Sequence, residues 1–212
     1  MGRAVAELVA RLGYDRYVVH GGDWGSHVGR DLAAADAAHV AGLHVTMTPG
    51  PPAAGDPVAE EKVAHYAGEL SGYAKLQGTR PLSLAPALTD SPAGLLAWIA
   101  ERFAEWTDPA SEVDVDQLLT NVAVYWFTRT GPSSAQLYWE RAHVPAPEWS
   151  RDVPTGVAVL PYDLFRPPRA AVEEVVDLVS WTEFSRGGHF AAMEVPDLLV
   201  EELRRFVRAV AR

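Results

Sequence analysis

The chain has 212 residues, which is enough for one hydrophobic core with a modest insertion. Its formal net charge of −10 argues against a nucleic-acid partner, because no stretch rich in Lys and Arg is present to neutralise phosphates. With no cysteine, a disulfide framework, a thiolate nucleophile and cysteine-bound metals are all excluded. No apolar run approaches the ~20 residues of a membrane span and the N-terminus has no secretion-signal pattern, so we expect a cytoplasmic protein.

The first predicted elements alternate between helix and strand. Apolar residues at helical spacing predict a helix over residues 4–12, which Gly13 ends. Short apolar runs predict buried strands at 14–22 and 40–47, and residues 24–37 between them favour a helix.

The pattern then changes to helices separated by Pro and Gly, which predicts an all-helical insertion over residues 49–152. Its helices are expected at 59–76, 91–106, 116–128 and 133–143, the second with Pro92 in its first turn.

From residue 153 onward the alternation returns. The predicted order is a strand at 155–161, a helix at 169–176, a strand at 178–185 and a closing helix at 196–210. Strands that alternate with helices predict a parallel α/β sheet covered on both faces. The chain therefore divides into core residues 1–48, a helical insertion 49–152 and core residues 153–212.

The sequence Gly-Gly-Asp-Trp-Gly follows the first predicted strand. Small residues two positions either side of Asp23 are what a sharp strand-to-helix turn needs when it carries a nucleophile, because the backbone there approaches itself closely. The alternative is that Asp23 only caps the following helix.

A serine hydrolase is a further alternative, in which His-Gly-Gly would supply an oxyanion hole and Ser133, in Gly-Pro-Ser-Ser-Ala, the nucleophile. About 30 residues separate Ser133 from Asp163, the next acid after a strand. That length cannot hold the two helices and two strands required, so this alternative is disfavoured.

Two more candidates lie at strand ends. Asp163 follows one predicted strand and His189, in a Gly-Gly loop, follows the next. Alone, each is more typical of a turn former or a surface histidine. Together with Asp23 they give the order nucleophile, acid, histidine along one sheet edge, where open α/β sheets place their sites. No carboxylate follows the 40–47 strand before Asp56, so Asp163 is the natural partner of His189.

These residues lie in stretches that resemble epoxide hydrolases of the α/β-hydrolase fold, of the microsomal and juvenile-hormone type. The stretches are GGDWGS (21–26), SGYAKLQGTRP (71–81), ALTDSPAGLLAWIAERFAEWTD (87–108), QLYWER (136–141), VPTGVAVLPYD (153–163) and RGGHFAAMEVPDLL (186–199).

The resemblance implies a partial α/β-hydrolase fold, with about four parallel strands from the later half of the sheet and an inserted helical cap. It also implies that Asp23 is the nucleophile, His189 the base and Asp163 the residue that orients it. Tyr73 and Tyr138 would hold the epoxide oxygen from the cap. Many relatives have Glu at the position of Asp163, and we expect the shorter acid to be tolerated.

The implied chemistry uses a carboxylate that is already ionised at neutral pH and attacks an epoxide carbon to form an ester. His189 then activates water, with the Trp24 backbone N–H as an oxyanion donor. The expected substrate is a small apolar epoxide together with water, and neither a cofactor nor a metal is expected. From the pattern alone, Tyr73 and Tyr138 are more typical of cap packing, and the resemblance favours a role in the site instead.

The tryptophans, among them Trp24, Trp98, Trp106 and Trp126, are expected to line an apolar pocket or to fill the cap core. The nearest enzymatic rival is a haloalkane dehalogenase, which also uses an Asp-Trp turn. A non-catalytic binding relative is the rival of another class, but it would have no need of all three of Asp23, Asp163 and His189.

The chain begins one helix before the predicted nucleophile strand and contains no His-Gly-x-Pro loop, which family members use for a second oxyanion donor. The strand at residues 17–21 would then present an unpaired edge. We therefore expect the isolated chain to be unstable or to associate, as a homo-oligomer or with a completing polypeptide, and to be a weak enzyme.

Overall fold

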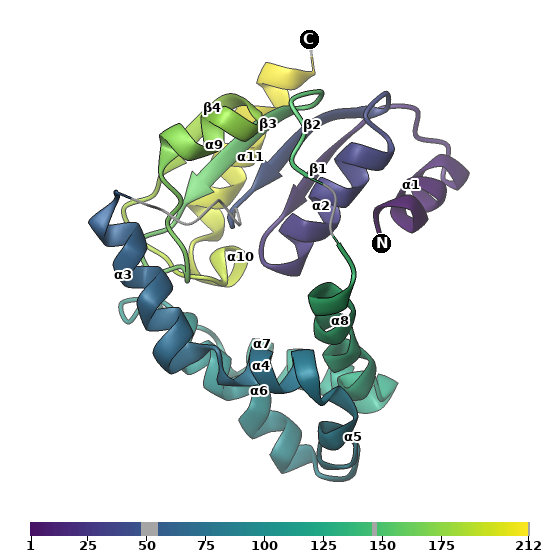
Figure 1. The fold of residues 1–212 in the computed structure, drawn as a ribbon, viewed down its shortest axis with the longest axis vertical. Coiled ribbons are helices and arrows are strands. Elements are labelled where there is room, and N and C mark those ends of the chain that lie inside the picture. The colour runs from purple at the N-terminus through teal and green to yellow at the C-terminus, as the bar shows by residue number, and fades with distance from the viewer. Residues whose placement is uncertain (48–54, 146–147, 212) are drawn as a thin grey trace.

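The computed structural model describes residues 1–47, 55–145 and 148–211. In these residues four parallel strands form one sheet in the order β1-β2-β3-β4, so that β1 and β4 are its edges (Figure 1). The strands are β1 (Tyr17–Gly21), β2 (Val40–Val45), β3 (Pro154–Val159) and β4 (Asp177–Glu183). This confirms the predicted partial α/β fold.

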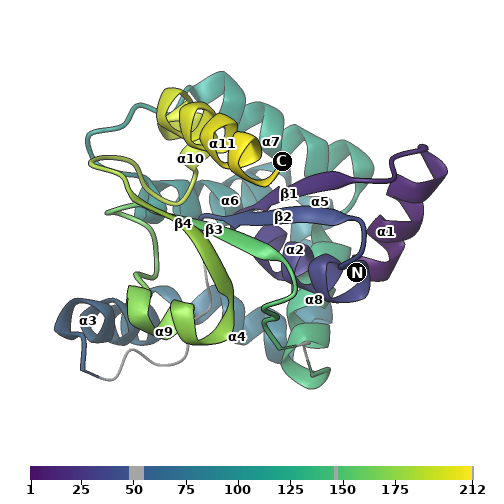
Figure 2. The same cartoon turned by 90° about the horizontal axis from the view of Figure 1, so that it is seen from above.

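Helices cover both faces of the sheet (Figure 2). They are α1 (Gly2–Arg11), α2 (Trp24–Ala35), α9 (Arg169–Val175), α10 (Ala191–Glu194) and α11 (Pro196–Val210). Leu43 packs into the core formed with α2 and α9, whereas its neighbour Gly42 faces the Phe206 ring on α11. A Cβ on Gly42 would come within 2.9 Å of that ring, so glycine lets α11 approach the strand closely.

The cap helices lie beyond the carboxyl ends of the strands (Figure 1). They are α3 (Pro57–His65), the π-helix η1 (Tyr66–Leu70), α4 (Gly72–Thr79), α5 (Pro81–Asp90), α6 (Pro92–Trp106), α7 (Val115–Thr128) and α8 (Gly131–His143). Leu88, Leu95 and Val122 form a core of their own here, separate from the core beside the sheet. The three-part division of the chain stays a prediction, and its first boundary, at residues 48 and 49, lies outside the described residues.

In the cap, one predicted helix was wrong and one helix was missed. The helix expected at 59–76 is interrupted by the π-helix, after which the Ser71 hydroxyl donates to the Ala67 carbonyl at 2.9 Å. The helix at 81–90 was not expected, because it contains two prolines. Pro81 is tolerated in its first turn, where no backbone N–H donor is needed, and Pro86 lies inside it.

None of the described helices combines the length and the apolar character needed to cross a lipid bilayer. A cytoplasmic location stays a prediction.

Candidate active site

Asp23 occupies a strained turn between β1 and α2. Its φ of 47° lies in the left-handed region, which residues other than glycine rarely adopt. A Cβ on Gly21 would lie 2.3 Å from the Gly25 backbone, so the turn can close only with glycine there. Asp23 stands at the first position before α2, yet its side chain makes no capping hydrogen bond. The capping alternative is therefore wrong for this carboxylate.

His189 connects the two aspartates. Its Nδ1 lies 2.7 Å from Oδ1 of Asp163, and its Nε2 lies 3.3 Å from Oδ2 of Asp23. Asp163 and His189 are buried, whereas the Asp23 side chain is 42% exposed. The Lys62 ammonium donates a hydrogen bond to the Asp163 backbone carbonyl at 2.7 Å, which connects α3 to the loop that contains Asp163. Three residues from separate loops at one sheet edge thus meet as the sequence predicted.

The two carboxylates decide the charge of His189. Burial would lower its pKa, but the hydrogen bonds and negative charges of Asp163 and Asp23 outweigh that effect and raise the pKa to about 10. At neutral pH the ring is therefore an imidazolium held between two carboxylates. Once the charge of Asp23 is removed, one of these two stabilising neighbours is lost, and the pKa falls toward the range in which the ring can accept a proton.

Replacing Asp23 by Asn is expected to lower the pKa of His189, and replacing Asp163 by Asn is expected to lower it further, because Asp163 makes the stronger contact. NMR titration of labelled histidine measures both changes. The raised pKa stabilises the folded chain fully below the unfolded value of 6.5, and that contribution is lost as pH rises through about 10. Asp197→Asn is the control, because Asp197 pairs with exposed Arg186 instead; a His189 pKa that is the same in all variants would contradict this assignment.

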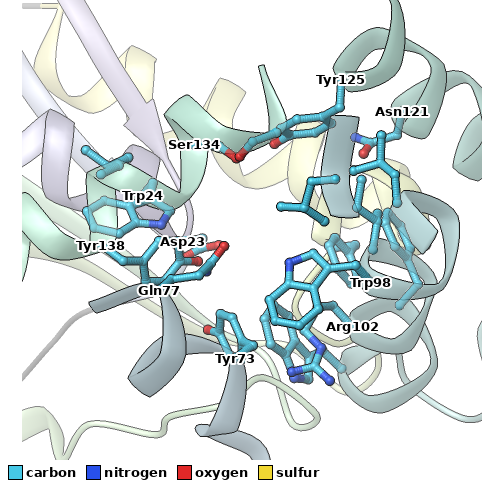
Figure 3. A pocket seen from close by; sticks show the side chains of 18 of the residues that line it. Asp23, Trp24, Tyr73, Gln77, Trp98, Arg102, Asn121, Tyr125, Ser134 and Tyr138 are labelled. Carbon is cyan, nitrogen blue, oxygen red and sulfur yellow. The ribbon is translucent and has the colours of Figure 1, made fainter. Parts of the chain in front are cut away.

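Two tyrosines from the cap face Asp23. Tyr73, on α4, and Tyr138, on α8, have ring centroids 5.7 Å apart, and Figure 3 shows both on the Asp23 side of the pocket. Burial, with the charge of Asp23, raises the pKa of Tyr138 to about 12, and burial likewise raises the pKa of Tyr73. Both phenols therefore stay protonated donors at neutral pH.

A cavity of about 370 Å³ opens between the cap and the sheet edge. Asp23, Tyr73 and Tyr138 line it on one side, and mostly apolar side chains line the rest (Figure 3). These apolar residues include Trp24, Leu88, Leu95, Trp98, Ile99, Phe103, Trp106, Leu137, Phe190 and Met193. Trp126, also singled out in the sequence, does not line this cavity and packs against the cap core, as Trp98 does too.

Ser133 has no place in this site. It lies in the first turn of α8, which follows α7 and not a strand, and its hydroxyl donates to the Thr130 carbonyl at 3.0 Å. The serine-hydrolase alternative is therefore not supported by the geometry.

Two residues beside Tyr73 had no site role predicted from the sequence. The Tyr66 hydroxyl lies 3.4 Å from the Tyr73 hydroxyl, and the Arg102 guanidinium lies over the Tyr73 ring at 4.9 Å. Arg102 also lies over the ring of Trp106, four residues on, at 5.5 Å. The i, i+4 spacing of Arg102 and Trp106 was a signal for the second contact, but nothing local in the sequence indicated that Tyr73 would pack against both.

The sheet and its helical cap have the α/β-hydrolase fold, and comparison with known proteins shows which proteins of that fold the chain is similar to. The chain is 42% identical to a provisionally named epoxide hydrolase of Stigmatella aurantiaca, over 98% of this chain and 50% of that protein. It is 32% identical to the juvenile hormone epoxide hydrolase of Bombyx mori, over 94% of this chain and 51% of the relative.

Solved structures agree with these relatives. The epoxide hydrolase of Aspergillus niger superposes with a TM-score of 0.84 at 29% identity, covering 99% of this chain and 56% of that one. The Bombyx mori juvenile hormone enzyme superposes with a TM-score of 0.82 at 27% identity, covering 99% and 58%. No family model matches the chain. The chain is thus a homologue of the epoxide hydrolases of the α/β-hydrolase fold, and it spans about half the length of the curated relatives it matches.

Proposed function

We propose that this chain carries the catalytic residues of an epoxide hydrolase, which opens an epoxide to a vicinal diol through a covalent ester of Asp23. The single observation that carries the proposal is the meeting of a carboxylate, an imidazole and two phenols beside one apolar cavity. The homology to epoxide hydrolases supports it.

In the first step, a carboxylate oxygen of Asp23 attacks an epoxide carbon, and the bond from that carbon to the ring oxygen breaks. The oxygen leaves as an alkoxide, which needs a proton or strong hydrogen-bond donors. Tyr73 and Tyr138 supply neutral donors without bringing another charge into an apolar pocket. The strained turn holds Asp23 forward at the cavity rather than against α2.

Between the steps, the alkoxide takes up the proton that His189 gives up. In the second step, the neutral ring of His189 removes a proton from water, whose oxygen attacks the carboxyl carbon of the Asp23 ester; the bond from that carbon to the alkyl oxygen breaks, the diol leaves, and Asp23 is again a carboxylate beside a protonated His189. Ester formation has by then removed the charge of Asp23, so the pKa of His189 is lower and the ring is available as a base. Asp163 holds the ring in the orientation that presents Nε2 to the ester. Trp24 is the first residue of α2, where N–H groups have no intrahelical acceptor, so its N–H can stabilise the oxyanion.

The cavity favours an apolar substrate with aromatic character. Trp98, Phe103 and Phe190 offer ring surfaces. The positive charge of Arg102 is balanced by ion pairs with Glu101 and Glu105, the latter at 3.0 Å.

Product analysis separates the proposed activity from its rivals. Incubation with styrene oxide is expected to give the diol, and incubation with 1-chlorobutane no halide. Halide release without diol would favour a dehalogenase. A dehalogenase would use the Trp24 indole N–H to bind halide. Here the Trp24 and Tyr138 rings meet edge to face, with their centroids 4.9 Å apart, and a hydrogen bond from the Trp24 side chain acts on the Tyr138 phenol. Tight binding of the epoxide with neither product would favour a binding protein.

The outer edge of β1 is the proposed place for a partner, either a second copy of this chain or a completing polypeptide. Among the described residues β1 pairs only with β2, which leaves a row of backbone groups free to pair. Size-exclusion chromatography and thermal melting test this, and a monomer with a sharp transition would contradict it.

A further inference from the structure

Two buried carboxylates hold the loop that carries His189, beside one backbone bridge between Tyr162 and Gly188. Asp108, which follows α6 in the cap, accepts a hydrogen bond from the Gly187 N–H at 2.8 Å. Glu194, in α10, accepts from the N–H groups of Gly188 and Phe190, each at 2.8 Å. Both residues are buried: the exposed fraction is 2% for Asp108 and 8% for Glu194. Three N–H groups that flank the imidazole therefore have a fixed acceptor.

The same two carboxylates join the loop to the cap. Oε2 of Glu194 accepts from the Asp108 N–H at 2.8 Å as well as from Gly188, so one oxygen connects both segments. The His189 N–H donates to the Trp106 carbonyl at 2.9 Å. A Cβ on Gly188 would lie 2.4 Å from that carbonyl, which shows how closely the cap segment is pressed against the loop.

We propose that Asp108 and Glu194 are positioning residues for His189, and that through them the cap sets where the imidazole stands relative to Asp163 and Asp23. His189 must meet both aspartates at hydrogen-bonding distance, and small displacements of a catalytic group are costly. Neither carboxylate reaches the substrate cavity, because neither is among the residues that line it. Their effect therefore acts through the loop.

One expected consequence of this proposal, slower hydrolysis of the Asp23 ester, rests on the proposed function. His189 is needed to hydrolyse the ester but not to form it. Loosening the loop should therefore slow hydrolysis of the Asp23 ester by about 10-fold or more, while ester formation changes little.

The test uses Asp108→Asn and Glu194→Gln in the 212-residue chain. Each amide keeps the size of the side chain but loses the charge and one acceptor oxygen. Asp114→Asn is the matched control, because Asp114 is a nearby cap aspartate that accepts from the Asp116 N–H at 2.9 Å and has no contact with the loop. Thermal melting first establishes that each variant is folded.

The first readout, NMR titration of His189, needs no turnover. A displaced ring loses contact with its carboxylates, so its pKa is expected to fall by about one unit or more in both variants and to stay unchanged in Asp114→Asn. A general loss of stability would not move this value in the folded molecules. The second readout is single-turnover reaction with styrene oxide, followed by mass spectrometry of the ester.

Folded variants with an unchanged His189 pKa would overturn the proposal. So would loss of the cooperative melting transition in both variants, since the carboxylates would then be structural. If the pKa falls as expected but even the unsubstituted chain forms no ester, the positioning role stands and the proposed function fails.

Discussion

His189→Gln is expected to trap the chain as a covalent ester of Asp23 after incubation with styrene oxide. The nucleophile and both phenols remain, so the ring opens, but no base is left to activate water for the second step. Intact-protein mass spectrometry should show one added substrate mass, and peptide mapping should place it on Asp23. The steady-state rate should fall by about 10⁴-fold or more.

Asp23→Asn is the matched comparison. An amide is a poor nucleophile, so this variant should gain no mass and should lose turnover to the same degree. An ester that forms in Asp23→Asn, or none in His189→Gln although the unsubstituted chain makes diol, would show that the reaction uses another nucleophile.

The second large expected effect is the loss of ester formation when both Tyr73 and Tyr138 lose their hydroxyls. Tyr73→Phe with Tyr138→Phe is expected to slow ester formation by about 10²–10³-fold, because the leaving oxygen then has no donor in an apolar pocket. Each single variant should lose less, because the other phenol remains 5.7 Å away between ring centroids. Rapid-quench measurement of ester formation reports this step directly.

Tyr125→Phe is the control for the pair. Tyr125 also lines the cavity, but Figure 3 places it beside Ser134, away from Asp23. It should change the rate of ester formation little. An equal loss in Tyr125→Phe would show that hydroxyls act through the polarity of the cavity as a whole, and not by holding the leaving oxygen.

Alternation of apolar strands with helices was enough to predict the sheet and the turn at Asp23. Each strand is a short apolar run, and glycine is needed at position 21 because a Cβ there would meet the Gly25 backbone, so the signal is local. The order Asp23, Asp163, His189 then followed from the rule that parallel strands end at one edge. These three side chains do meet.

The cap was harder to predict because its geometry depends on contacts between distant segments. The π-helix at residues 66–70 has no distinctive pattern of apolar residues. Helix α5 was not predicted because its sequence contains Pro81 and Pro86, which are unusual in helices. For Tyr73 and Tyr138 the helical pattern suited packing as well as function, and the resemblance alone favoured a role. That Asp108 would bind the loop of His189, 79 residues further on, could not be read from either segment alone.

The sheet and the cap contribute different parts of the site, and this affects how the substrate range of such a chain can change. The proposed nucleophile, acid and base all lie on loops of the sheet, whereas most of the cavity wall comes from α5 to α8. Mutations in those helices can therefore change which substrates fit the cavity, while the three proposed catalytic residues on the sheet loops stay unchanged. The cap residues least free to vary are Tyr73 and Tyr138, which we propose hold the leaving oxygen, and the segment Trp106–Asp108, which contacts the loop of His189 directly.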